Sequence, residues 1–195
     1  VSNWMLDNIK DVKPRRFSIS AALSQDLRYG ENPHQSASFF LDENLQVGIG
    51  ASNQIQGKQL SYNNINDTDA ALELVNEFPQ NDGAAAVIVK HANPCGVGVA
   101  SSLVEAYRSA FSCDKTSAFG GIVALNRIID EESAREIIKV FTEVVVAPGI
   151  TEGARQIFSP KSNLRLLITE KSSDHACSAK VLSLIHISEP TRRRG

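Results

Sequence analysis

The sequence predicts an α/β domain built around a largely parallel sheet, and two observations support this fold class. Segments with apolar residues at helical spacing alternate along the chain with short segments that are apolar throughout. The short segments lack the polar alternation of a strand with one face in water, so helices are expected to cover both faces of the sheet. The composition, 42% hydrophobic and 22% charged, is that of a globular protein.

The elements expected before residue 80 are separated by polar stretches. Residues 7–26 contain Lys-Pro-Arg-Arg among other polar residues and are interpreted as a linker, whereas residues 36–41 are expected to form a strand. Asn66 or Asp67 can cap a helix that continues to Phe78, because apolar residues recur there on one helical face.

From residue 84 onward, strands and helices are expected to alternate regularly. Residues 84–89 are apolar without interruption, which predicts a strand that is covered on both faces. Ser101 or Ser102 is expected to cap the helix that follows. The next expected elements, in order, are a strand at 121–125, a helix from Asp130 to about Phe141, and strands at 144–147 and 164–169.

Charge and cysteine content argue against several classes of protein. The formal net charge of −2 gives no broad basic surface for nucleic acid, and no apolar run approaches the ~20 residues that a membrane span needs. Cys95, Cys113 and Cys177 are widely spaced and form no CxxC motif. They predict free thiols in a reducing compartment and argue against a zinc site built from cysteines.

The last residues of the chain differ in character from the rest. Residues 182–192, LSLIHISEPTR, match one reading frame of a transposase adapter that is commonly used in sequencing libraries. Residues 182–195 are therefore interpreted as an artefactual tail and left out of the fold prediction. The alternative is a genuine basic tail that contacts acidic partners.

The strand at 84–89 leads directly into Lys90 and His91, followed by a stretch rich in proline and glycine, HANPCGVG. Burial of the strand explains its apolar residues but not two ionisable side chains at its end. In open α/β sheets, ligands bind at the carboxyl ends of strands. The small residues after His91 would let a ligand approach backbone amides, and the helix start at Ser101 or Ser102 would favour an anion.

A lysine beside a histidine at such an edge suits acid–base chemistry. Histidine titrates near neutrality, with an ordinary pKa of about 6.5, and can act as a general base. A lysine ammonium can stabilise an oxyanion or protonate a leaving nitrogen. Together they suit acyl transfer to a weak nitrogen nucleophile. The simpler alternative is that Lys90 extends into solvent and His91 only hydrogen-bonds a loop.

Other clusters contain groups that could face a ligand. In LRYGENPHQ, Arg28 can bind a phosphate or carboxylate through two hydrogen bonds and Tyr29 can stack or donate, or the stretch can be a structural turn. In SAFGGIVALN, Gly120 and Gly121 would let the backbone approach a ligand, or simply begin a strand. Taken alone, Glu143 is interpreted as a solvated surface acid.

Two other motif interpretations fail on spacing. GVGVAS and GIGASN are incomplete versions of the GxGxxG pattern, so dinucleotide binding has little support. HANPCG resembles part of the zinc-deaminase signature, which needs HxE and a later PCxxC. Here Asn93 stands in place of the glutamate and Gly98 in place of the second cysteine.

Five blocks in order give the sequence a resemblance to a known family: LRYGENPHQ, LSYNNINDTDAA, VIVKHANPCGVG, SAFGGIVALNR and FTEVVVAPG. They resemble the bifunctional purine biosynthesis family, in which an IMP cyclohydrolase domain is joined to an AICAR formyltransferase domain. The resemblance extends over residues 1–169. It implies that residues 1–6 end the cyclohydrolase domain and that residues 27–181 are part of the formyltransferase domain, with incomplete cytidine deaminase-like α/β layers and no zinc.

The family resemblance also implies a reaction and a set of site residues. The formyl group of 10-formyltetrahydrofolate would pass to the 5-amino group of AICAR, and the product would close to IMP on the other domain. His91 would be the base, and Lys90 would assist the tetrahedral transition state or the departing folate nitrogen. The residues implied to bind AICAR are Arg28, Tyr29, Asn64, Gly120 (or Gly121) and Glu143.

The resemblance further implies a homodimer with composite sites, no catalytic metal, and a cytoplasmic or plastid location. Family members are longer at both ends, and the part after residue 169 carries much of the folate site. The fragment by itself is therefore expected to be inactive. The alternatives are a nucleotide-binding module without chemistry and a metal-dependent relative of the deaminases.

Overall fold

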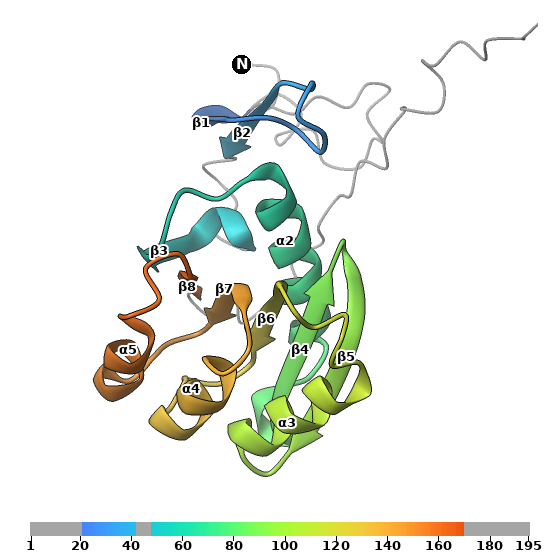
Figure 1. Ribbon diagram of the computed structural model, residues 1–195, viewed down its shortest axis with the longest axis vertical. Coiled ribbons are helices and arrows are strands. Elements are labelled where there is room, and N and C mark those ends of the chain that lie inside the picture. The colour runs from blue at the N-terminus through green and yellow to red at the C-terminus, as the bar shows by residue number, and fades with distance from the viewer. Residues whose placement is uncertain (1–20, 42–47, 170–195) are drawn as a thin grey trace, which may run out of the picture.

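The structure is a computed structural model that describes residues 21–41 and 48–169. It consists of a six-stranded sheet with helices on both faces and a separate two-stranded sheet (Figure 1). Residues 1–20 and 170–195 lie outside the described residues. The expectations for the end of the cyclohydrolase domain, most of the linker, Cys177 and the tail at 182–195 fall there.

The six-stranded sheet is mixed, so the prediction of a largely parallel sheet is wrong. Only β6–β7 and β7–β8 pair in parallel, and the other three pairs are antiparallel. The difference arises because β4 turns back directly into β5 instead of crossing over through a helix. In sheet order the strands are β3 (Ser52–Gln56), β8 (Arg165–Thr169), β7 (Thr142–Ala147), β6 (Gly121–Leu125), β4 (Ala84–Lys90) and β5 (Asn93–Ala100).

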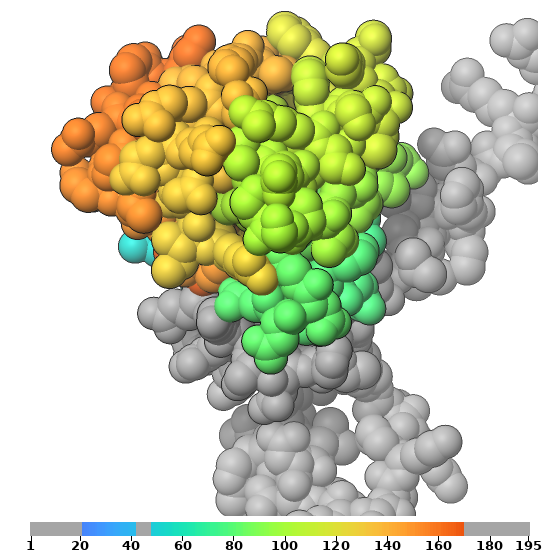
Figure 2. Space-filling view, turned by 90° about the horizontal axis from the view of Figure 1, so that it is seen from below, coloured from blue at the N-terminus to red at the C-terminus, as the bar shows by residue number. Residues whose placement is uncertain are grey.

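Helices cover both faces of the sheet, as the continuous apolar strands predict. The long helix α2 (Tyr62–Asn76) packs on one face, where it contacts β4, β6 and β7. The other face is covered by α3 (Leu103–Cys113), α4 (Glu131–Ile137) and α5 (Glu152–Phe158). Figure 2 shows these three helices side by side as one continuous surface. The alternate residues of 84–89 divide between the two cores, and all are buried.

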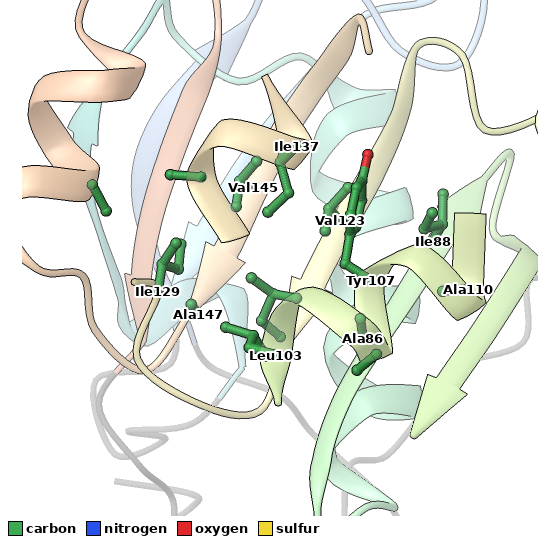
Figure 3. Packing of buried hydrophobic residues seen from close by; sticks show 14 of the residues in the cluster. Ala86, Ile88, Leu103, Tyr107, Ala110, Val123, Ile129, Ile137, Val145 and Ala147 are labelled. Atoms are coloured by element: carbon green, nitrogen blue, oxygen red, sulfur yellow. The ribbon is translucent and has the colours of Figure 1, made fainter. Parts of the chain in front are cut away.

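The core on the three-helix face is built from small and large apolar residues of both the strands and the helices. Figure 3 shows Leu103 and Tyr107 of α3 and Ile137 of α4 directed toward Val123 and Val145 of the sheet. All five side chains are buried. At the usual value of ~25 cal/mol per Å², each such apolar side chain contributes about 1.5–3 kcal/mol on burial. This packing fixes the strand ends at which the proposed site lies.

Several element boundaries differ from those predicted. Helix α2 begins five or six residues earlier than expected because Ser61 caps it, so Asn66 and Asp67 lie inside the helix. Helix α4 ends at Ile137, before the expected end near Phe141, and Phe141 is exposed. The HANPCGVG stretch is mostly strand β5 rather than a turn.

Besides β5, two strands and one α-helix were not predicted. The strand β1 (Ala22–Leu27) falls mostly within the stretch interpreted as a linker, and it pairs with β2 (Ala37–Leu41) in the two-stranded sheet. The others are β3, which is rich in polar residues, and the short helix α5. In all three, local polarity or short length hides the period that marks a strand or a helix.

No helix in residues 21–41 and 48–169 is long and apolar enough to cross a membrane. Cys95 and Cys113 are free thiols, as their spacing predicts. In the same described ranges, no three His, Cys, Asp or Glu side chains are grouped so that they could hold a metal ion.

Candidate functional site

The β4–β5 hairpin places Lys90 and His91 at one edge of the sheet. Lys90 pairs with Asn93 across the hairpin, and His91 and Ala92 form the two-residue loop between them. Lys90 and this loop are together called the Lys90–His91 loop. Both loop residues have positive φ angles, 54° and 55°, which is the backbone of a type I′ turn. A residue other than glycine loses about 1–2 kcal/mol in this conformation, so neighbouring groups must hold the loop in place.

Hydrogen bonds from α2 and from the chain before β6 hold this loop. The carboxylate of Asp67 accepts the backbone N–H groups of His91, at 3.0 Å, and of Ala92, at 2.9 Å. The Nζ atom of Lys90 donates to the carbonyl of Phe119 at 2.9 Å. The ammonium of Lys90 is therefore fixed beside Gly120, whereas the His91 residue is exposed.

The two glycines before and at the start of β6 have different surroundings. Gly120 is half-buried, has a φ of 74°, and donates its N–H to the carbonyl of Phe141 at 2.7 Å. Gly121 is buried between β4 and the preceding turn, where a Cβ would lie 2.9 Å from the carbonyl oxygen of Val89. Of the two, Gly120 is the one with space beside it.

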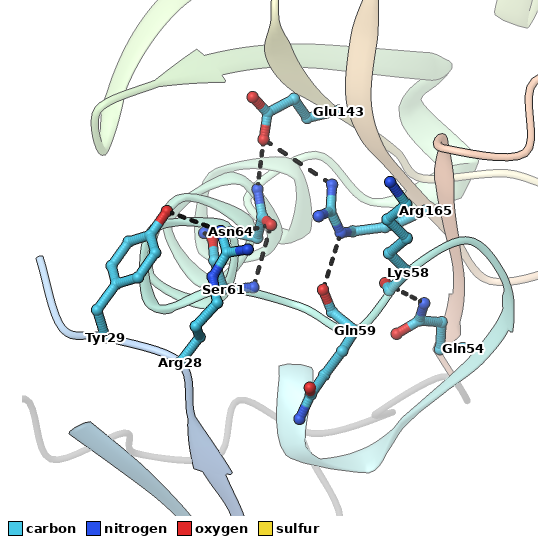
Figure 4. A network of polar contacts seen from close by, with 9 residues as sticks. All are labelled: Arg28, Tyr29, Gln54, Lys58, Gln59, Ser61, Asn64, Glu143 and Arg165. Carbon is cyan, nitrogen blue, oxygen red and sulfur yellow. Dashed lines mark hydrogen bonds and ion pairs between the residues drawn. The ribbon is translucent and has the colours of Figure 1, made fainter. Parts of the chain in front are cut away.

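Asn64 and Glu143 join α2 to the sheet at the same edge (Figure 4). The buried amide of Asn64 donates through Nδ2 to Oε2 of Glu143 at 2.7 Å. Its Oδ1 accepts from the backbone N–H of Ser61, and the Ser61 hydroxyl caps the helix by accepting the Asn64 N–H. Asn64 thus belongs both to the helix cap and to the contact with Glu143.

Arg165, the first residue of β8, is a further cation beside Glu143. Its guanidinium lies 4.0 Å from Oε2 of Glu143, and its Nε donates to the carbonyl of Gln59 at 3.3 Å. The Gln59 side chain in turn donates to Oε1 of Gln25 on β1 at 3.0 Å. This chain of contacts links the two-stranded sheet to the edge of the main sheet.

The structure brings five of the seven expected site residues together at one edge of the sheet. Lys90 donates to the Phe119 carbonyl next to Gly120, and the Gly120 N–H donates to the Phe141 carbonyl, two residues before Glu143. Glu143 accepts from Asn64 of α2. Asp67 of the same helix accepts from the His91 N–H. Because β4 is antiparallel to β6, its carboxyl end lies beside the amino ends of β6, β7 and β8. The carboxyl-end rule therefore holds for β4, whereas Glu143 and Arg165 lie at the amino ends of β7 and β8.

Arg28 and Tyr29 lie on the chain that follows β1. The guanidinium of Arg28 lies 4.9 Å from the centre of the Tyr29 ring and donates to its hydroxyl at 3.3 Å. Figure 4 shows both side chains pointing from the end of β1 toward the first turn of α2. In the described part of the chain, no hydrogen bond or ion pair joins their side chains to the other five expected site residues.

The start of α3, which the sequence suggests as a place for an anion, lies away from Lys90 and His91, and its two serine hydroxyls bind a carboxylate of the same helix. Ser102 caps this helix, and the hydroxyls of Ser101 and Ser102 both donate to Oε2 of Glu105 at 2.8 Å. These bonds, from Ser101 and Ser102, hold the pKa of Glu105 below its ordinary value. The helix start is also at the far edge, because Ala100 pairs with Ala84 at the beginning of β4.

Cys95 is the thiol closest in sequence to the Lys90–His91 loop. Burial, followed by the charge of Asp114, raises the pKa of this thiol above its ordinary value of 9.0. The thiol is therefore protonated at neutral pH, and a protonated thiol is a poor nucleophile. The ionisable groups that the geometry makes available at this edge are Lys90, His91, Glu143 and Arg165.

An exposed aromatic pair borders the site next to Lys90. Phe119 and Phe141 are 58% and 52% exposed, and their ring centroids lie 5.3 Å apart. A cavity of about 470 Å³ opens beside them and extends to the loop at residues 160–164. The edge therefore combines charged groups with an exposed aromatic pair.

Sequence reasoning missed two residues of this site. The sequence pattern indicates Asp67 only as a helix cap and Arg165 only as part of a strand. The available signal for Asp67 was its spacing: once Ser61 is recognised as the cap, Asn64 and Asp67 stand three residues apart on one helical face. No local signal marks Arg165, because its contact with Glu143 joins two strands.

Comparison with known proteins places the chain in a family. Residues 1–187 match the family model described as the AICARFT/IMPCHase bienzyme. The chain belongs to this family. The resemblance based on the five sequence blocks is thereby confirmed.

Bacterial members of the AICARFT/IMPCHase family are closely similar in sequence. The chain is 59% identical over 170 residues to the bifunctional purine biosynthesis protein PurH of Ruegeria sp. (strain TM1040). The matched residues are 87% of this chain and 32% of that protein. It is 58% identical over 174 residues to PurH of Roseobacter denitrificans, which covers 89% of this chain and 33% of that protein. The chain thus spans about a third of the length of these relatives.

Among solved structures, Acinetobacter baumannii RibD (form 2) is a partial match. It covers 51% of this chain and 34% of the RibD chain, at 18% sequence identity and a TM-score of 0.38. The fold class is therefore taken from the structure itself, which is an α/β fold with a mixed six-stranded sheet.

Proposed function

We propose that this chain is the AICAR-binding half of a formyltransferase domain and contains its Lys90–His91 pair. The parent protein, meaning the longer protein of which this chain would be a segment, would transfer a formyl group from 10-formyltetrahydrofolate to AICAR. Its other domain would close the product to IMP. The observation that carries the proposal is the Lys90–His91 loop at the edge shared with Gly120, Glu143 and Asn64, in a chain of this family.

The proposed reaction needs a base and a cation on the same edge. The 5-amino nitrogen of AICAR attacks the formyl carbon, and His91 accepts the proton that the nitrogen loses. The bond between the formyl carbon and the folate nitrogen then breaks, and that nitrogen takes up a proton. Lys90 stabilises the oxyanion of the tetrahedral intermediate or supplies this proton. The bond of Lys90 to the Phe119 carbonyl supports such a fixed position for its ammonium.

The remaining residues would hold the nucleotide. Arg28 suits the phosphate of AICAR because a guanidinium binds phosphate oxygens with two parallel hydrogen bonds, and Tyr29 would add a stacking or hydrogen-bonding contact. Asn64 fixes the carboxylate of Glu143, which can accept hydrogen bonds from hydroxyl or amino groups of the nucleotide. Gly120 would let the nucleotide approach the backbone.

The proposal is tested by replacing the two catalytic residues in the parent protein. His91→Ala should lower kcat/KM by about 10²–10⁴-fold, as expected for the loss of a general base. Lys90→Met should also lower kcat, and Lys115→Met is its matched control because Lys115 is an exposed lysine outside the site. The measurement is formyl transfer to AICAR at saturating 10-formyltetrahydrofolate.

Two experimental outcomes would contradict the proposal, and each would indicate a different function. Activity that is unchanged in His91→Ala would indicate a module that binds the nucleotide without doing chemistry on it. Zinc bound at one ion per chain, together with release of ammonia from a nucleotide base, would indicate a metal-dependent relative of the deaminases.

A further inference from the structure

Asp67 makes the contact that decides the shape of the Lys90–His91 loop. It lies in the second turn of α2, and its two carboxylate oxygens accept separate hydrogen bonds, Oδ2 from the His91 N–H and Oδ1 from the Ala92 N–H. The two distances, 3.0 Å and 2.9 Å, are those of well-formed hydrogen bonds. A single side chain from a helix thus holds two consecutive amides of a strand hairpin.

The loop sequence does not favour the conformation that it adopts. Type I′ turns need positive φ angles at both central residues, which is why Asn-Gly and Asp-Gly are the preferred pairs. Here the pair is His91-Ala92, and a Cβ on each residue opposes the left-handed conformation. Two consecutive amides that point the same way form a concave site for an anion, and the Asp67 carboxylate occupies it. The tertiary contact therefore replaces the missing turn preference.

Two further contacts make the arrangement rigid. Nδ2 of Asn93 donates to the carbonyl of His91 at 2.7 Å, so both the N–H and the carbonyl of His91 are bound. Asn64, three residues before Asp67 on the same helix, binds Glu143. The helix α2 therefore connects the proposed base directly to a residue proposed to contact the nucleotide.

We infer that Asp67 is the positioning residue of the formyl transfer: by binding the His91 and Ala92 amides, it holds the His91 imidazole at the reacting edge. This inference rests on the proposed function, because it assigns a task to Asp67 only if His91 is the base. Asp67 acts through the backbone of the loop and not on the imidazole, so its loss should change the geometry of catalysis more than the binding of AICAR.

The first test replaces Asp67 in the parent protein and separates kcat from KM. Asp67→Ala removes both hydrogen bonds, and Asp67→Asn keeps the size of the side chain but turns one acceptor into a donor that faces an N–H. Both should lower kcat by about 10–100-fold, the loss expected when a reacting group is misplaced. The KM for AICAR should change less than threefold. Glu77→Gln, which removes a carboxylate at the other end of α2, is the control and should leave kcat unchanged.

The second test restores the loop without restoring the carboxylate. Ala92→Gly removes the Cβ that opposes the positive φ at residue 92, so the turn forms more readily without Asp67. The double variant Asp67→Ala/Ala92→Gly should therefore recover at least threefold of the kcat lost in Asp67→Ala. A residue needed only for the stability of α2 would not be rescued in this way.

A third measurement does not depend on activity. In the 195-residue chain, Asp67→Asn should speed amide hydrogen exchange at His91 and Ala92 at least tenfold, whereas the amides in the middle of α2 should keep their protection. Unchanged exchange at both amides would show that the carboxylate does not hold the loop and would overturn the inference. General loss of protection along α2 would overturn it as well, because Asp67 would then serve the helix.

The same assays separate failure of this inference from failure of the proposed function. If His91→Ala is inactive but both Asp67 variants keep the kcat of the wild type, the inference is wrong and the proposed function stands. If His91→Ala itself keeps full activity, the proposed function is wrong and the inference fails with it. Loss of kcat without rescue by Ala92→Gly contradicts the positioning role alone.

Discussion

Gly120 and Gly121 are adjacent in sequence, but each is required for a different reason. Gly120 has a φ of 74°, a conformation that side chains disfavour, yet a Cβ built on it meets nothing closer than the Phe141 ring at 3.5 Å. Gly121 has ordinary strand geometry, but its Cβ would lie 2.9 Å from the Val89 carbonyl oxygen and 3.2 Å from that of Ala118. The first glycine is constrained by its backbone angle and the second by space.

These two constraints predict different effects of the same substitution. Gly120→Ala should destabilise the fold by about 1 kcal/mol, and Gly120→Asn by less, because asparagine tolerates the left-handed conformation. Gly121→Ala should cost about 2–3 kcal/mol, because the atoms that it meets are backbone atoms of packed elements. Urea denaturation of the three variants measures the differences. If Gly120→Ala lowered the free energy of unfolding more than Gly121→Ala, the assignment of the stronger constraint to the space around Gly121 would be contradicted.

At the scale of elements, β5 and α3 approach each other more closely than any side chain would permit. A Cβ on Gly96 would lie 2.0 Å from the Ala110 carbonyl oxygen, and one on Gly98 would lie 2.2 Å from that of Ala106. Both glycines therefore serve the packing of the helix on the edge strand. The glycines of the GVG stretch, interpreted from sequence as an approach for a ligand, instead allow contact between two elements.

This close contact predicts a large effect for a single added methyl group. Gly98→Ala should lower the free energy of unfolding by about 3 kcal/mol, because α3 must move away from the sheet to admit the Cβ. Val99→Ala, at the next position of the same strand, is the control: Val99 is 48% exposed, and its truncation should change stability by less than about 0.5 kcal/mol. Thermal unfolding monitored by circular dichroism compares the two. Equal effects would show that β5 and α3 separate without cost.

The elements that could be predicted are those whose pattern is local. The strand at 84–89 is apolar throughout and is buried on both faces as expected. Helix α3 begins directly after its capping residue, Ser102, which is of a type that commonly caps helices. The strand β5 could not be predicted, because glycine and proline disfavour strands and only the tight packing against α3 makes glycine necessary there. Tertiary contact overrides local preference at this position.

The same distinction applies to the site. Lys90 and His91 stand out in the sequence because two ionisable residues end an apolar run, and they do lie at the sheet edge. Asp67 cannot be assigned in this way, because its contact with His91 joins residues 24 positions apart in the chain and depends on how α2 lies on the sheet. Local chemistry identifies the candidate base, whereas only the fold identifies the group that holds it.

For the whole molecule, the arrangement of the site residues bears on what the chain can do alone. Five expected site residues meet on the edge of the main sheet, whereas Arg28 and Tyr29 lie in the connection between the strands of the two-stranded sheet, which is joined to that edge through the Gln59–Gln25 contact. Two-stranded sheets are marginally stable without further packing. Since the chain spans about a third of the length of its relatives, the parent protein would supply additional surfaces around both parts.

The isolated 195-residue chain should therefore fail to transfer the formyl group even though it contains Lys90 and His91. Orienting two substrates accounts for about 7–11 kcal/mol of the barrier in a well-organised site, and the proposed folate contacts lie mainly beyond residue 169. An assay with AICAR and 10-formyltetrahydrofolate should show no turnover above background for the chain, while the parent protein at the same concentration is active. Isothermal titration of the chain with AICAR tests binding separately. Turnover by the chain within tenfold of the parent would show that the complete catalytic site lies within these residues.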